Sequence, residues 1–234
     1  TGERYITPEL KELENKILGA NERLLVLEHQ LFADLLEAIS AQLLRIQRTA
    51  FAVAQLDVLA SFAEAAVQNN YVKPTVDDSD VLSITEGRHP VIEQMLKGSL
   101  FVPNDTTLDE TENRMLIITG PNTGGKTVSI KTAGLLNAMA QHGFLIPAHE
   151  SSTVCHFDEY LVDIGDEQSI EQSLSTFSGH MKRITGILEL AGPDTLTLID
   201  ELGAGTDPAE GAALAVSILE RLRKQGTLLM ATTH

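Results

Sequence analysis

The residues with the clearest chemical potential form a glycine-rich segment that ends in lysine and threonine. Residues 120–127 read Gly-Pro-Asn-Thr-Gly-Gly-Lys-Thr, which fits the pattern G-x-x-x-x-G-K-[ST]. In a loop of this type, backbone N–H groups surround a phosphate chain and the next helix points its positive end at the same anion. An apolar run, Met115–Thr119, precedes the segment as a strand would. The sequence therefore predicts a site for a nucleoside triphosphate.

Each residue of this segment has an expected role. We expect Lys126 to reach the β- and γ-phosphates of ATP and Thr127 to place its hydroxyl on Mg²⁺. The residues predicted to contact the nucleotide are Gly120, Pro121, Asn122, Thr123, Gly124, Gly125, Lys126 and Thr127. The alternative is a glycine-rich turn that binds nothing, and the preceding strand makes that interpretation the weaker one.

A second chemical feature lies further along the chain, where residues 195–201 read Thr-Leu-Thr-Leu-Ile-Asp-Glu. In ATPases with a phosphate loop, a carboxylate at the end of such a strand belongs to the Mg²⁺ shell, which suits Asp200. The adjacent Glu201 is our predicted general base for the attacking water. A strand that ends in surface acids is common, so this feature gains its weight from the glycine-rich segment upstream.

Two polar residues could complete a site shared between two chains. Ser175 precedes a helical run, and a capping serine with free N–H groups can receive a γ-phosphate, although a plain helix cap fits as well. Nothing in the sequence places Ser175 beside its own glycine-rich segment, so it could act across a dimer. His234, after Ala231-Thr232-Thr233, could sense the γ-phosphate. The turn at residues 203–208 is an interface loop or merely a connection.

The composition limits the classes of protein. The net charge of −16 argues against a chain that grips DNA over a basic face. Cys155 is the only cysteine, so no internal disulfide can form and a reducing cytoplasm fits. No uninterrupted apolar run approaches a membrane span and no signal peptide opens the sequence, so we expect no membrane partner.

The chain reads as two unlike parts, and we predict a helical segment over residues 1–80. Thr7 and Pro8 suit the start of a helix. Apolar residues then recur in steps of three and four at Leu10, Leu13, Ile17, Ala20, Leu24, Leu27 and Leu31. Such a stripe fits a coiled coil or a long helix packed on its own return helix. A second helical segment spans about 42–68, and the sequence does not decide whether one helix or two runs through Ser40.

Residues 81–234 predict an α/β domain with a largely parallel sheet, whose ligand chemistry would lie at the carboxyl ends of the strands. The expected strands are Val81–Ile84, Met115–Thr119, Phe144–Ile146, Leu196–Ile199 and Thr227–Met230. The expected helices are Val128–Gln141, Thr176–Ala191 and Glu210–Lys224. Because an open sheet would normally continue after His234, we expect a fragment or a truncated domain.

Taken together, these motifs resemble those of the MutS family of DNA-repair ATPases. The similar segments are residues 86–91, 120–127, 175–177, 198–206 and 231–234, in the family's order. The resemblance implies an ABC-type P-loop ATPase fold, preceded by a long-helix core or lever segment, and a homodimer with composite sites. It also implies that Ser175 and Asn122 contact the other subunit's γ-phosphate, that Phe101 stacks on adenine and that His234 is a switch residue. Phe101 fits a core phenylalanine equally well.

The resemblance has a mosaic character. Residues 3–36 and 84–95 look most like the mismatch-repair branch of the family. Residues 120–139, 163–181 and 200–213 look more like a paralogous branch linked to recombination suppression and ribosome rescue. A natural intermediate, a recombinant and an artificial sequence all fit this pattern.

We therefore expect a DNA-repair ATPase that uses ATP and Mg²⁺, is cytoplasmic and nucleoid-associated, and works with other repair proteins. Its contact with mismatched DNA would lie mostly in regions outside this chain. One alternative is a paralogue that acts on branched DNA or stalled ribosomes, and another is an ATP-binding dimerisation module with little hydrolysis. A transporter ATPase is disfavoured, since Leu174-Ser175-Thr176-Phe177 replaces the Leu-Ser-Gly-Gly-Gln signature.

Overall fold

The computed structural model describes residues 5–96, 100–121, 124–165 and 173–233, except for the side chains of residues 173–176. The chain forms two compact units, Thr1–Ser61 and Phe62–His234. Each unit is described by itself below. The domain boundary near residue 80 stays a prediction, because a division into compact units does not by itself define domains.

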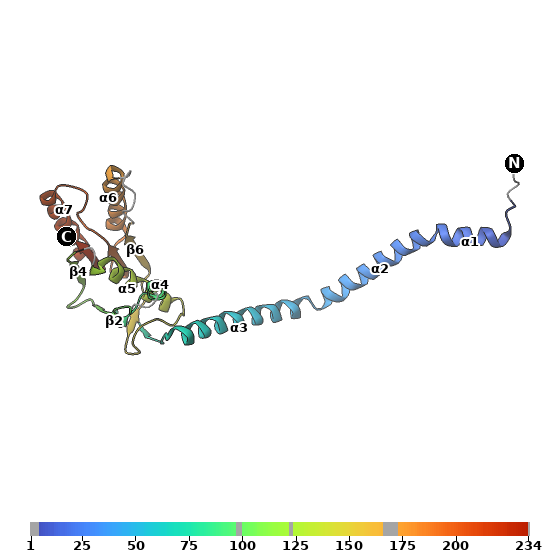
Figure 1. The fold of residues 1–234 in the computed structure, drawn as a ribbon, viewed down its shortest axis with the longest axis horizontal. Helices are drawn as coiled ribbons and strands as arrows, with labels where there is room; N and C mark the ends of the chain where they lie inside the picture. Colours follow the sequence, from blue (N-terminus) through green and yellow to red (C-terminus); the bar gives the residue numbers. More distant parts are fainter. Residues whose placement is uncertain (1–4, 97–99, 122–123, 166–172, 234) are drawn as a thin grey trace. The chain divides into compact units, whose positions relative to one another are not determined.

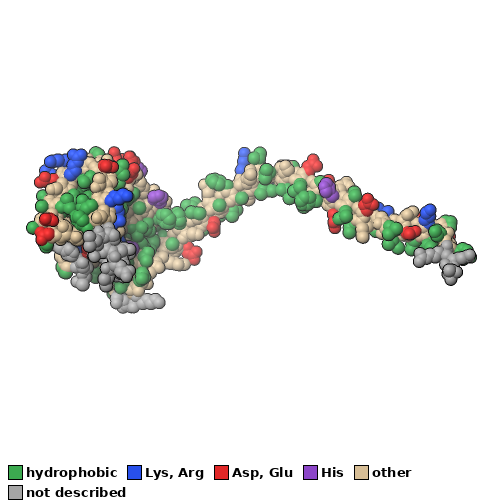
Figure 2. Space-filling view, turned by 90° about the horizontal axis from the view of Figure 1, so that it is seen from above, with side chains coloured by type: hydrophobic (Ala, Val, Ile, Leu, Met, Phe, Trp, Pro, Cys, Tyr) green, Lys and Arg blue, Asp and Glu red, His purple; other side chains and the backbone are tan. Residues whose placement is uncertain are grey.

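The first unit is helical, as the sequence predicts. Helix α1 (Pro8–Leu18) starts with Pro8 in its first turn, and the Thr7 hydroxyl accepts a hydrogen bond from the Leu10 N–H at 3.2 Å. Helix α2 (Ala20–Ala41) runs through Ser40. The helical conformation is interrupted at Gln42, and helix α3 (Leu43–Asn69) follows. The apolar stripe of α1 and α2 is not covered within this unit (Figure 2), and its exposed members include Leu10, Leu13, Ile17, Leu24, Leu27 and Leu31.

Helix α3 has a property that the apolar pattern of the sequence does not suggest. By length and composition it is apolar enough to cross a membrane, although no uninterrupted apolar run in the sequence suggests this. The reason is its many alanines and few charges, which raise the mean hydropathy without an unbroken apolar run. A core helix of a soluble protein has the same composition, so this finding does not assign α3 to a membrane.

The end of α3 belongs to the second unit and is firmly capped. Asn70 has a left-handed φ of 53°, and the Tyr71 N–H donates to the Ala66 carbonyl at 2.9 Å, which is the hydrogen bond of a Schellman cap. The ring of Phe62 lies 4.2 Å from that of Phe144, centroid to centroid. The predicted strand Phe144–Ile146 was therefore wrong: this segment is a loop that packs on α3, with one isolated bridge from Ile146 to Val72.

Two four-stranded sheets form the frame of the second unit (Figure 1). One is parallel throughout, in the order β4-β8-β7-β6, and contains β4 (Met115–Thr119), β6 (Glu159–Asp163), β7 (Thr195–Ile199) and β8 (Leu228–Thr233). The other is mixed, in the order β1-β5-β2-β3, and contains β1 (Thr75–Asp77), β2 (Leu82–Gly87), β3 (Asn104–Leu108) and β5 (Thr153–Cys155). The prediction of an α/β fold is confirmed, and the second, mixed sheet is an addition to it.

Helix α5 (Lys126–Gln141) lies between the two sheets. Its buried side chains Ile130 and Leu136 share one hydrophobic cluster with Leu82 of the mixed sheet and Leu198 of the parallel sheet. Cys155, 1% exposed, belongs to the same cluster, and burial raises the pKa of its thiol to about 12. This environment is that of a packed core residue, not of a reactive thiol.

Two further helices cover the opposite face of the parallel sheet. Helix α6 (Ser173–Leu190) contributes Ile184 and helix α7 (Pro208–Gln225) contributes Ile218 to a second hydrophobic cluster, which also contains Leu229 of β8. A short helix, α4 (Pro90–Met95), follows β2. The parallel sheet is thus buried on both faces, and its carboxyl edge carries the candidate site.

Candidate functional site

The 120–127 loop joins β4 to α5, as the sequence predicts. Gly120 has a φ of 133° and Gly125 a φ of 79°, and both values favour glycine. Apart from the adjacent residues, no atom of the described part of the chain lies within 4 Å of where a Cβ would stand at Gly120, Gly124 or Gly125, so the described part of the loop leaves room for a ligand to approach the backbone. Helix α5 begins at Lys126, which places free N–H groups and a positive dipole end at the same point.

The amine of Lys126 lies within this loop. It is 5% exposed as a residue, and its Nζ donates hydrogen bonds to the carbonyl oxygens of Gly120 and, at 3.3 Å, of Thr233 at the end of β8. These are neutral carbonyl partners. The charge of the amine is therefore available to an anion held by the loop.

A side-chain hydrogen bond joins the loop to the acidic strand end. The hydroxyl of Thr127 donates to the Asp200 carboxylate at 2.7 Å, although the two residues lie far apart in the sequence. The other oxygen of Asp200 accepts from the Thr232 hydroxyl, and Asp200 is 6% exposed. A hydroxyl and a carboxylate oxygen are ligands that Mg²⁺ accepts.

Glu201 follows in a strained conformation. Its φ of 54° is left-handed, which is uncommon for a residue with a side chain. Its N–H donates to the Thr232 hydroxyl at 2.7 Å, so β8 holds the backbone at this point. Strain of this type, held by its surroundings, occurs often at functional sites.

A comparison with known protein families assigns the region that contains this arrangement to one of them. The model of the family described as MutS domain V matches residues 116–234, which is more than half of the chain. The chain belongs to the MutS family. The matched region contains both the 120–127 loop and the acids at residues 200–201.

Relatives from both branches of the MutS family are similar to the chain over nearly its whole length. The DNA mismatch repair protein MutS of Alkaliphilus oremlandii is 43% identical over 99% of the chain, and that of Caldicellulosiruptor bescii is 44% identical over 99%. The protein named Endonuclease MutS2 of Clostridium botulinum is 49% identical over 97% of the chain. The chain spans 26% of the first of these relatives and 27% of the other two.

The nucleotide, metal and catalytic roles of all the predicted site residues stay predictions, and for several residues the structure adds little to their placement. Asn122, Thr123 and His234 lie outside the described residues. The prediction that Ser175 precedes and caps its helix is wrong, because α6 begins at Ser173 and Ser175 lies within its first turn; its side chain is not described. Pro121 is exposed in the loop, and Phe101 is half-buried in the segment before β3, where its stacking on adenine is untested.

Sequence reasoning missed two groups of polar residues beside the acids. The hydroxyl of Thr232 donates a hydrogen bond to the carboxylate of Asp200 and accepts one from the N–H of Glu201. Asp163, at the end of β6, bonds His180 and Arg183 of α6. No expected strand covers residues 159–163, so no pattern in the sequence pointed to Asp163. It ends β6, which pairs with β7, and Asp200 directly follows β7.

Proposed function

We propose that this MutS-family chain is an ATPase module with an ABC-type P-loop fold that couples ATP binding and hydrolysis to the recognition of mismatched DNA by other parts of the protein. The observation that carries the proposal is the hydrogen bond between Thr127 and Asp200, because it brings together the two motifs that the sequence assigns to one nucleotide site. The similarity to MutS proteins named for DNA mismatch repair supports the proposal that mismatched DNA is the substrate this ATPase serves.

The residues fit ATP and Mg²⁺. The described residues hold no group of three or more His, Cys, Asp or Glu side chains that could bind a metal by themselves. A cation here would thus depend on Thr127, Asp200 and phosphate oxygens together, as in other P-loop enzymes. Bound Mg²⁺ would supply charge neutralisation at the β- and γ-phosphates.

The chain's own groups would divide the remaining work. The N–H groups of the 120–127 loop would hold the phosphates, and Lys126 would turn its amine from the Gly120 carbonyl to the γ-phosphate. The Glu201 carboxylate would orient a water molecule and accept its proton. Through its two hydrogen bonds, Thr232 would fix the carboxylate of Asp200 relative to the backbone of Glu201.

We further propose a homodimer in which Ser175 completes the partner's site. Under this proposal, residues 1–80 form a core or lever segment, residues 81–234 form the ATPase domain, and the protein is cytoplasmic and nucleoid-associated. DNA contact would lie mainly outside this chain, in agreement with its net charge of −16.

The deciding experiment is Mg²⁺-dependent ATP hydrolysis per chain over a wide range of protein concentration. We expect the specific rate to rise with concentration and to saturate, because a composite site forms only in the dimer. A flat, background rate with nucleotide still bound would replace the ATPase proposal with that of a binding and dimerisation module.

A second candidate function follows from the similarity to the proteins named Endonuclease MutS2, which reaches 49% identity. The ATPase would then serve branched DNA or stalled ribosomes instead of mismatches. The two candidates make the same prediction for hydrolysis by this chain. They differ in the nucleic acid whose addition to the whole protein changes the ATPase rate.

A further inference from the structure

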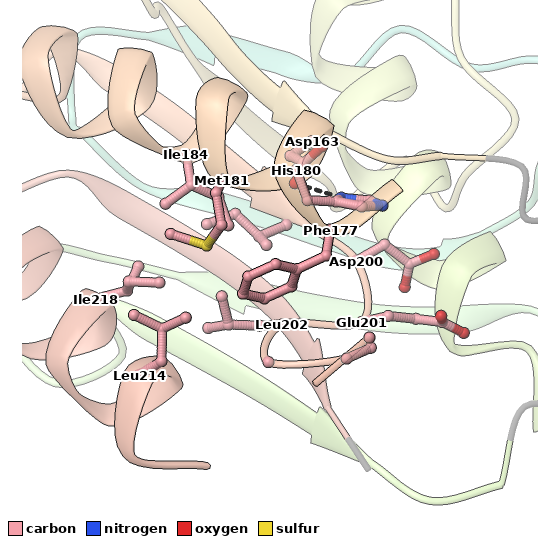
Figure 3. A pocket seen from close by; sticks show the side chains of 14 residues that line it. Asp163, Phe177, His180, Met181, Ile184, Asp200, Glu201, Leu202, Leu214 and Ile218 are labelled. Carbon is pink, nitrogen blue, oxygen red and sulfur yellow. Dashed lines mark hydrogen bonds and ion pairs between the residues drawn. The ribbon is translucent and has the colours of Figure 1, made fainter. Parts of the chain in front are cut away.

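Asp163 lies where the candidate site meets helix α6. Its side chain is 1% exposed, at the last position of β6. Its backbone carbonyl accepts a hydrogen bond from the Asp200 N–H at 2.9 Å, so it holds the residue that the proposed function assigns to Mg²⁺. Figure 3 shows the side chain of Asp163 beside that of His180, in the pocket that Asp200 and Glu201 also line.

The carboxylate of Asp163 holds α6 at two points. One oxygen accepts from Nδ1 of His180 at 2.8 Å, and the other accepts from Nε of Arg183. The two donors are three residues apart, which places them on one face of the helix. Because a buried carboxylate is costly without partners, this pair of contacts strongly fixes the position of α6.

An apolar contact fixes the same end of α6 from the other side. Phe177 packs against Gly205: a Cβ atom built onto this glycine would lie 3.6 Å from the Cβ of Phe177. Phe177 and His180 line a cavity of about 20 Å³ together with Asp200 and Glu201, and this volume suffices for one water molecule (Figure 3). A shift of α6 would therefore change the surroundings of both acids.

We propose that Asp163 is a positioning residue that sets the first turn of α6, and with it Ser175, relative to Asp200 and Glu201. Ser175 lies five residues before His180 on the same helix, so it moves with the segment that Asp163 holds. The role of Ser175 rests on the proposed function. The attachment of α6 to Asp163 does not.

The first test measures the position of the helix without reference to activity. In the full chain, Asp163→Asn removes the charge, and Arg183→Ala removes one donor from a half-exposed position where folding is not at risk. We expect faster amide hydrogen exchange in the first two turns of α6 in both variants, with unchanged exchange in α5 and β7. Arg221→Ala, an exposed arginine on α7, is the matched control.

Rescue separates a positioning role from general stability. Arg183→Lys keeps a donor, and His180→Asn keeps an N–H close to the position of Nδ1, whereas His180→Ala keeps none. We expect the Lys and Asn variants to restore slow exchange in α6. Unchanged exchange in Asp163→Asn would overturn the inference, and so would faster exchange throughout the second unit that Arg183→Lys does not correct.

The second test concerns catalysis. We expect ATP binding within about twofold of the parent in Asp163→Asn and Arg183→Ala, with kcat reduced about tenfold or more, because small misplacements of catalytic groups cost this much. An unchanged kcat despite a loosened α6 would overturn the effect on Ser175. If the parent chain itself shows no hydrolysis, the proposed function fails while the exchange experiment still decides whether Asp163 holds α6.

Discussion

At the scale of single residues, Glu201 combines a proposed chemical role with a backbone cost. A left-handed φ costs a residue with a Cβ roughly 1–2 kcal/mol, and the hydrogen bond from its N–H to Thr232 holds that conformation. If Glu201 is the general base, the chain keeps an unfavourable backbone in order to aim a carboxylate at the site. The two properties can be separated by substitution.

The carboxylate is tested by Glu201→Gln, which keeps the shape and removes the base. We expect nucleotide binding within about twofold of the parent, and hydrolysis reduced by about 10²-fold or more, since general base catalysis contributes this much. Fluorescent-nucleotide titration and phosphate release measure the two effects. Normal turnover in this variant would remove Glu201 from the mechanism.

The backbone is tested by comparing Glu201→Gly with Glu201→Ala, since both lack the carboxylate but only glycine accepts a φ of 54° without strain. We expect the glycine variant to be more stable than the alanine variant by about 1 kcal/mol in urea unfolding. Equal midpoints would show that this backbone is not strained.

His89 gives a pH dependence at the same scale. Its Nδ1 accepts from the Ile92 N–H at 3.4 Å as the cap of α4, and burial, followed by the charge of Lys131, lowers the pKa of His89 below 6.5. A lowered pKa in the folded state means that this contribution to stability is complete above pH 6.5 and is lost as the pH falls through the folded pKa.

His89→Asn isolates this contribution, because asparagine caps a helix without titrating. We expect the difference in unfolding midpoint between the parent and His89→Asn to be constant above pH 7, and the parent to lose stability relative to the variant below pH 6.5. A difference that does not change between pH 5 and pH 8 would contradict the assignment.

The residues of the site were predictable to different degrees. Thr127 and Asp200 follow from motif spacing, and the structure brings them within hydrogen-bond distance. Thr232 and Asp163 carry no local signal that separates them from ordinary strand residues. Their contacts depend on the strand order β8-β7-β6, which spacing along one chain does not give.

At the scale of elements, helix α5 approaches β7 very closely at Gly134. A Cβ added to Gly134 would overlap Cδ1 of Leu198. Among the described residues, and apart from the backbone of α6 around it and the adjacent residues, no atom lies within 4 Å of a Cβ added to Gly186. Alanine favours a helix over glycine by about 1 kcal/mol where space allows. The two glycines therefore form a matched pair.

We expect Gly134→Ala to lower the free energy of unfolding by about 1–3 kcal/mol through overpacking, and Gly186→Ala to raise it by roughly 0.5–1 kcal/mol. Urea unfolding of the two variants measures both changes. Stabilisation by both substitutions would mean that α5 moves away from the sheet at little cost.

Elements with a strong pattern were predictable and those with mixed composition were not. The strand Met115–Thr119 has the predicted bounds, because it is an apolar run before a glycine loop. Strand β3, Asn-Asp-Thr-Thr-Leu, reads as a polar loop, and only its pairing with β2 makes it a strand. The reverse error occurred at Phe144–Ile146, which was predicted as a strand and is a loop. Its apolar residues pack against Phe62 and form a single bridge to Val72 instead of a strand pairing.

At the scale of the whole molecule, both hydrophobic clusters consist of residues from the second unit. Buried apolar area is the main source of folding free energy, so the second unit contains most of what stabilises the chain. The helical character of residues 8–69 could be predicted from the sequence. The stripe's partner could not, since periodicity gives a face and not its neighbour.

We expect a chain of residues 62–234 to unfold cooperatively with a thermal midpoint within about 3 °C of the full chain, a shift that corresponds to roughly 1 kcal/mol. Differential scanning calorimetry with and without Mg²⁺ and ATP provides the comparison. A much lower midpoint for the shortened chain would show that residues 1–61 contribute to the stability of the second unit.

The buried thiol of Cys155 has a practical consequence for all of these measurements. A group with a pKa of about 12 that is 1% exposed reacts negligibly with maleimides at neutral pH while the protein is folded. A reporter dye can therefore be attached to a cysteine engineered elsewhere without background labelling. In the parent chain, the slow reaction of Cys155 with the same reagent reports how often the core opens, so its labelling rate measures local or global unfolding.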